Sequence, residues 1–179
     1  MGNTICTVLE NPDDHKCKTF LLNVVLFQPE IPQNTGNIGR LCAYTGTCLH
    51  LIHPLGFSLS EKHIRRSGMD YWDTLDKMEH ANWEDFQESR DPARNLWLLT
   101  TRASNPHWDA AFEPGDYLLF GNEGRGCPES IHQRIPDERK LKIPQLVAGH
   151  RSLNLSTSVG IIVYEALKKI KENVKFDVY

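Results

Sequence analysis

Short apolar segments alternate with helical segments along most of this chain, and this alternation constrains the fold more than any other feature. Five runs rich in Leu, Val, Ile and Phe have the length of buried strands, and Gly or Pro closely follows most of them. Strands that alternate with helices predict an α/β fold, with a mostly parallel sheet and helices on both faces. The expected strands are 21–27, 48–52, 96–100, 117–120 and 141–143.

Helices are expected where apolar residues recur at helical spacing beside capping residues. The expected helices are 38–44, a segment after Ser60, a segment from the Asn82 cap through Ser89, and 155–173. By contrast, residues 1–19 are polar and show no periodicity. We therefore expect a loose N-terminal extension over 1–19, followed by a single domain over 20–179.

Composition narrows the class of protein. The net charge of -3 excludes a broadly basic nucleic-acid coat but leaves room for a local basic site. No stretch approaches the roughly 20 apolar residues of a membrane helix. The five cysteines include no CxxC pair, which favours a reducing, cytoplasmic setting over a disulfide scaffold. Zinc is disfavoured because Cys48, His50 and His53 have no second ligand pair after them.

Three polar loops are the candidate functional segments: 34–40, 121–126 and 151–156. Their glycine spacing does not match a dinucleotide-binding fingerprint, which disfavours a dehydrogenase, and the chain has neither a P-loop nor a nucleophile elbow. Taken singly, each loop is explained by a turn or a helix cap. Because parallel strands end at one edge of a sheet, the three loops are also placed to converge on a ligand there.

Taken together, the segments 34–40, 119–126 and 152–159 resemble the three motifs of the SpoU/TrmH branch of SPOUT RNA methyltransferases. The likeness spans about residues 21–170. Within the branch the chain is most similar to the subgroup of tRNA (cytidine/uridine-34-2′-O)-methyltransferases, through 27–32, 65–71 and Thr100-Thr101. The segment 145–150 departs from that subgroup's pattern and is one residue longer.

The resemblance implies a fold with a C-terminal trefoil knot, the cofactor S-adenosylmethionine (SAM) and a homodimer whose two chains complete each site. The implied reaction is 2′-O-methylation of the wobble nucleotide of tRNA, with leucine tRNAs as the expected substrates. No metal and no membrane take part. Two alternatives stay open: a 2′-O-methyltransferase of ribosomal RNA, and a SAM- or RNA-binding module without catalysis.

Carried over residue by residue, the motifs imply that Arg40, Glu123, Asn154 and Tyr164 form the catalytic group. A guanidinium stays protonated, so Arg40 is expected to orient a phosphate or the 2′-oxygen and to stabilise negative charge. Simpler explanations are a surface arginine, a turn carboxylate at Glu123, a helix cap at Asn154, and a core or interface tyrosine at Tyr164.

The resemblance also implies a cofactor pocket built by the loops after three strands. The implied cofactor-binding residues are Leu99, Gly121, Ile143, Ser152 and Leu153. RNA would be held by a local basic patch, for which a solvated helix face is the simpler alternative. The candidates for this patch are Arg65, Arg66 and Arg102, with Lys62 and His63 beside them.

Overall fold

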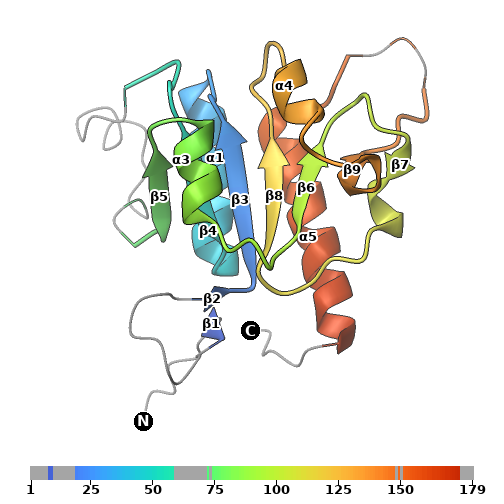
Figure 1. Cartoon of the computed structure of the whole chain (residues 1–179), viewed down its shortest axis with the longest axis horizontal. Coiled ribbons are helices and arrows are strands. Elements are labelled where there is room, and N and C mark those ends of the chain that lie inside the picture. Colours follow the sequence, from blue (N-terminus) through green and yellow to red (C-terminus); the bar gives the residue numbers. More distant parts are fainter. Residues whose placement is uncertain are drawn as a thin grey trace.

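A seven-stranded sheet in the order β5–β4–β3–β8–β6–β9–β7 lies at the centre of the computed structural model (Figure 1). Each neighbouring pair of its strands is parallel, which confirms the predicted α/β fold. The structure describes residues 8–9, 19–58, 72, 74–147, 149 and 151–173. The strands are β3 (Leu22–Phe27), β4 (Cys48–Ile52), β5 (Lys77–His80), β6 (Leu96–Leu99), β7 (Asn105–Pro106), β8 (Asp116–Phe120) and β9 (Lys140–Lys142).

The central strands are apolar throughout because both faces of the sheet are covered. All six residues of β3 are buried, and alternate side chains enter two separate hydrophobic clusters. Leu22, Val24 and Leu26 belong to one cluster, and Val25 and Phe27 belong to the other. A continuous apolar run is therefore what a strand in this position requires.

Helices cover both faces of the sheet, as predicted. On one face α1 (Pro32–Thr45) and α5 (Leu155–Asn173) contribute buried side chains such as Ile38 and Ile162 (Figure 1). On the other face α3 (Trp83–Ser89) and the short α4 (Glu129–His132) contribute Phe86 and Ile131. Two 3-10 turns, η1 (His107–Asp109) and η2 (Asp137–Arg139), directly follow β7 and directly precede β9, respectively.

Two helix ends follow local capping rules. Gly46 ends α1 in the left-handed conformation with φ of 64°, as its position after the predicted helix indicates. Asn82 caps α3 by accepting a hydrogen bond from the Asp85 backbone N–H at 2.9 Å. The Asp85 carboxylate in turn accepts from the Ala81 N–H at 2.8 Å. This reciprocal arrangement explains why the predicted helix through Ser89 is correct.

Other elements differ from the sequence prediction. Helix α1 begins at Pro32 and not at Ile38, because its first turn is held by contacts from elsewhere in the chain. The edge strands β5 and β7 were not predicted, since both are short and β5 is polar. The expected helix after Ser60 lies outside the described residues. No helix in the described part of the chain is long and apolar enough to cross a membrane.

Near the N-terminus, β1 (Val8–Leu9) pairs in antiparallel fashion with β2 (Thr19–Phe20). These four residues form a two-stranded sheet that is separate from the central one. The pairing joins part of the expected N-terminal extension to the residues that lead into β3.

Candidate active site

The loop after β8 holds the start of α1 through one carboxylate. Glu123 accepts hydrogen bonds from the backbone N–H groups of Glu30 at 2.8 Å and Ile31 at 3.3 Å, and from Asn34 Nδ2 at 2.9 Å. Ile31 is the N-cap of α1, which has no side-chain cap of its own and no acidic residue in its first turn. Glu123 therefore supplies the acceptor and the negative charge that this helix end lacks.

Asn34 connects this carboxylate to the last helix. Its side chain lies in the first turn of α1 and is 5% exposed. A carboxylate can only accept, so the amide must present Nδ2 to Glu123 and Oδ1 to the opposite side. There Oδ1 accepts a hydrogen bond from Asn154 Nδ2 at 2.9 Å. Both polar ends of this buried amide are thus satisfied, which fixes its orientation.

The same Asn154 side chain that contacts Asn34 also caps the start of α5. Its Oδ1 accepts hydrogen bonds from the backbone N–H groups of Ser156 at 2.9 Å and Thr157 at 3.3 Å, and from the Ser156 hydroxyl at 2.7 Å. One side chain therefore caps the start of α5 and joins it to α1. The chain of bonds Glu123–Asn34–Asn154 connects all three polar segments, which confirms that they converge, although 34–40 is part of helix α1 and not a loop.

Asn34 is not among the site residues expected from the sequence. It stands inside the first motif, but sequence patterns give no way to distinguish it from its polar neighbours Gln33 and Asn37. Its burial is the distinguishing feature, because an amide inside a fold must satisfy both of its ends. Only the long-range pairing with Glu123 and Asn154 reveals this role.

Arg40 lies on α1 but on a different face of the helix. Ile38, Gly39 and Cys42 turn toward the core, whereas Arg40 and Tyr44, one helical turn apart, are exposed. Arg40 therefore lies at the surface of the same helix that carries Asn34. The network holds the first turn of this helix, and so helps to fix the backbone that carries Arg40.

The candidate cofactor residues lie at the carboxyl edge of three neighbouring strands. Leu99 ends β6 and pairs in register with Phe120 of β8 and Leu141 of β9. Gly121 and Ile143 directly follow those two strands. Leu99 and Ile143 are half-buried, so each presents part of its apolar surface at this edge. Parallel pairing, and not proximity in sequence, brings them together.

The remaining cofactor candidates, Ser152 and Leu153, directly precede the Asn154 cap. Both are exposed, and the exposed fraction of Leu153 is 51%. Leu146 and Val147 in the preceding loop are exposed by 91% and 62%. The segment before α5 therefore carries apolar side chains that the described residues of this chain leave uncovered.

Gly121 is required by its own loop. A Cβ at this position would lie 2.2 Å from the backbone nitrogen of Cys127 and 2.2 Å from the carbonyl carbon of Gly126. The loop folds back because the Gly126 N–H donates to the Asn122 carbonyl at 3.0 Å, with Gly126 at φ of 70°. The close approach of two backbone segments therefore excludes a side chain here, whatever ligand lies nearby.

Tyr164 is exposed by 51% and is not a core residue. Val159, Ile162 and Val163 lie on the buried face of α5, whereas Ile161, three residues before Tyr164 and so on the same side of the helix, is 37% exposed. Of the two simpler explanations for this tyrosine, an interface position fits the structure and a core position does not.

The candidate RNA-binding residues are only partly described. Arg65 and Arg66, with Lys62 and His63, lie outside the described residues. Arg102 follows β6 and forms an ion pair with Glu129 at 2.5 Å, both side chains being more than half exposed. The Arg102 guanidinium lowers the pKa of the Glu129 carboxyl below its usual range. The charge of Arg102 is thus shared with an acidic partner.

The histidines considered as zinc ligands have other partners. His50 is buried, with Nδ1 3.0 Å from His80 Nε2 and Nε2 3.3 Å from Asn23 Oδ1. Burial, with His80 beside it, lowers the pKa of His50 to about 3. His53 Nε2 lies 2.8 Å from the Glu79 carboxylate. The His50–His80 pair is a neutral element of the core, away from the three loops.

Comparison with known protein families identifies the family of this chain. The model of the SpoU rRNA Methylase family matches residues 21–164, which include the parallel sheet and all three loops. The chain belongs to this family.

Individual relatives are also similar over most of their length. A tRNA (cytidine(34)-2′-O)-methyltransferase of Escherichia coli K12 is 46% identical over 150 residues, which cover 84% of this chain and 94% of that protein. A solved structure described as "Structural insights into the 2-OH methylation of C/U34 on tRNA" is 44% identical, with a TM-score of 0.77 over 83% of this chain and 95% of the other.

A more distant structure shares the fold alone. The SpoU methyltransferase AviRb from Streptomyces viridochromogenes, solved in complex with the cofactor AdoMet, is 20% identical. Its TM-score is 0.70 over 89% of this chain and 64% of that protein.

Proposed function

We propose that this protein transfers a methyl group from SAM to the ribose 2′-oxygen of the wobble nucleotide, position 34, of tRNA. The observation that carries the proposal is the bond network Glu123–Asn34–Asn154, which assembles three polar loops at one edge of a parallel sheet. The names of the similar proteins support the substrate, since they specify 2′-O-methylation of this nucleotide. Leucine tRNAs are the expected substrates.

The residues at the strand ends suit SAM. Leu99 and Ile143 offer half-buried apolar surface, and Leu153 in the third motif has an exposed apolar side chain. Backbone groups of the loops containing Gly121 and Ser152 supply polar contacts for the rest of the molecule. These residues would hold the cofactor, which supplies an electrophilic methyl group on a sulfonium when bound.

The chemistry requires the 2′-oxygen to approach in line with the methyl group and to lose its proton. The Arg40 guanidinium donates hydrogen bonds and stays charged, so it orients the oxygen or a neighbouring phosphate and stabilises developing negative charge. It does not act as a base at neutral pH. Glu123 and Asn154 act as positioning residues, because their acceptor groups hold the start of α1, the helix that carries Arg40, and the start of α5.

The apolar side chains that are exposed on α5, and in the segment that precedes α5, support a homodimer. Ile161 and Tyr164 on α5 and Leu153 before it would be covered by a second copy of the chain, which would bring Tyr164 close to a shared site. Two copies also double any basic patch, which helps a chain of net charge -3 to bind RNA. We also propose that the fold contains a C-terminal trefoil knot and that the protein is cytoplasmic.

The experiment is methyl transfer from labelled SAM to bulk tRNA lacking this modification, followed by mapping of the labelled nucleotide. We expect label on the ribose of nucleotide 34. Label in ribosomal RNA and not in tRNA would support 2′-O-methyl transfer but would make ribosomal RNA the substrate. SAM binding without transfer to either RNA would refute the enzyme proposal in favour of a binding module.

A further inference from the structure

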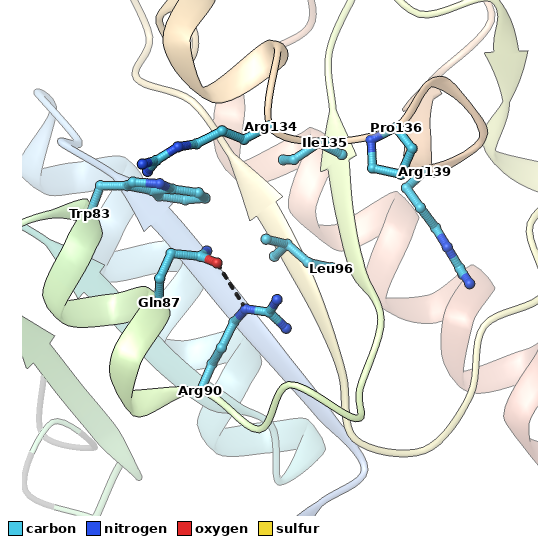
Figure 2. Close-up of a pocket in the computed structure, with 8 residues that line it drawn as sticks. All are labelled: Trp83, Gln87, Arg90, Leu96, Arg134, Ile135, Pro136 and Arg139. Carbon is cyan, nitrogen blue, oxygen red and sulfur yellow. Dashed lines mark hydrogen bonds between the residues drawn. The ribbon is translucent and has the colours of Figure 1, made fainter.

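A cavity of about 160 Å³ lies on the face of the sheet opposite α1 and α5 (Figure 2). It lies between α3 and the segment that follows α4. Leu96 and Ile135 provide its apolar lining, and Leu96 is the first residue of β6. The candidate active site is at the other end of this strand, after Leu99. The cavity is therefore separate from the three loops.

The charge of the lining is positive. Arg90 comes from the end of α3, and Arg134 and Arg139 come from the segment after α4, as Figure 2 shows. None of the described residues that line the cavity is acidic. Arg134 pairs with Glu84 at 3.3 Å, but both side chains are more than half exposed, so water screens this contact. Arg139 lies over the Trp97 ring, 4.4 Å from its centroid, and retains its charge.

Two buried N–H groups of the lining find no acceptor within the part of the chain that the structure describes. Trp83 is 6% exposed, and its Nε1 has no hydrogen-bond partner among the described residues; the same holds for Gln87 Nε2. The Gln87 orientation is fixed because Oε1 accepts from Arg90 Nε at 3.2 Å, and a guanidinium can only donate. The unpartnered atoms are therefore donors, and an unsatisfied buried donor is costly.

The cavity thus offers guanidinium groups and N–H donors. A ligand that complements it must be an acceptor and negatively charged, which describes an oxyanion. Arginine forms paired hydrogen bonds with phosphate oxygens, and a cavity of roughly this volume holds one benzene-sized group. The volume accommodates a single phosphate but not a whole nucleotide.

We propose that this cavity binds a phosphate group. The expected source is a backbone phosphate of the substrate RNA, and in this respect the inference rests on the proposed function. A free phosphate monoester has the same chemistry and is the other source. An RNA held here as well as at the three loops would contact two faces of the molecule.

The first test compares tRNA binding by Arg134→Gln and Arg139→Gln with binding by Lys171→Gln. The control removes the same charge from an exposed side chain near the end of α5. We expect each cavity variant to bind about fivefold more weakly and to reduce the slope of log Kd against log salt by about one. The control should have a smaller effect, and SAM binding and thermal unfolding should stay unchanged in all three.

The second test titrates inorganic phosphate and uridine monophosphate into the full-length protein without RNA, with tryptophan fluorescence as the readout. Saturable binding that both cavity variants lose, together with unchanged tRNA salt slopes, would assign the site to free phosphate. Salt slopes equal to those of Lys171→Gln, with no saturable phosphate binding, would overturn the inference. The titration is independent of methyl transfer, so its failure is distinct from failure of the proposed function.

Discussion

Replacing Asn34 by aspartate tests the network that assembles the candidate active site. The change keeps the shape of the side chain but exchanges the amide donor that faces Glu123, 2.9 Å away, for a carboxylate oxygen. Two unit charges at this distance repel by about 6 kcal/mol at an effective dielectric constant of about 20. The buried side chain, 5% exposed, cannot turn to water to avoid this repulsion.

Protonation limits the cost. Holding an aspartate protonated at pH 7 costs about 4 kcal/mol relative to its unfolded pKa of about 3.9, which is less than the repulsion. The pair of carboxyl groups therefore shares one proton, and the free energy of unfolding falls by about 4 kcal/mol at pH 7. Because the folded variant binds the extra proton, the loss shrinks by about 1.4 kcal/mol per pH unit toward about 1.5 kcal/mol at pH 5.

The assay is urea unfolding of wild type and Asn34→Asp at pH 5, 6, 7 and 8 and one protein concentration. At each pH the free energy of unfolding of the variant is subtracted from that of the wild type. This difference removes the contribution of groups that titrate in the same way in both proteins. Asn37→Asp is the matched control, since it adds the same charge to an exposed side chain on the same helix, α1, outside the Glu123–Asn34–Asn154 network. A difference that does not change with pH would refute the reasoning.

Three further predictions follow from the same geometry. Arg40→Ala should reduce methyl transfer at least 100-fold while SAM affinity, measured by calorimetry, stays within about twofold, and near-normal turnover would contradict its role. Gly121→Ala should destabilise the loop by about 1–3 kcal/mol because its Cβ would lie 2.2 Å from the Cys127 nitrogen, and it should weaken SAM binding; unchanged unfolding would contradict the close approach. His50, with a folded pKa of about 3, stays neutral while the unfolded state gains a proton below about pH 6.5. The free energy of unfolding should therefore fall by about 2 kcal/mol from pH 7 to pH 5, and His50→Gln should flatten this slope.

Much of the fold could be predicted because local patterns and burial agree. The apolar runs 21–27 and 48–52 became β3 and β4 with at most one residue of difference, and Asn82 begins α3 as expected. A central strand must be apolar on both faces, so its sequence is distinctive. The polar edge strand β5 has no such requirement and is recognised only by its pairing with β4.

The start of α1 shows where local sequence is insufficient. Its first turn contains Asn34, Thr35 and Gly36, which favour a turn over a helix. The turn is helical because Glu123, from the loop after β8, accepts the N–H groups of Glu30 and Ile31. A carboxylate so distant in sequence leaves no local signal.

The sequence by itself determined the class of fold, the three polar loops and the family resemblance, since each depends on residue types within short segments. Only the tertiary structure decided that Asn34 joins those loops, that Gly121 is required by its own loop, and that three arginines surround a cavity on the opposite face. These features depend on contacts between residues far apart in the chain. Hydrogen bonding, steric contact and charge act over a few ångströms in space, whatever the separation in sequence.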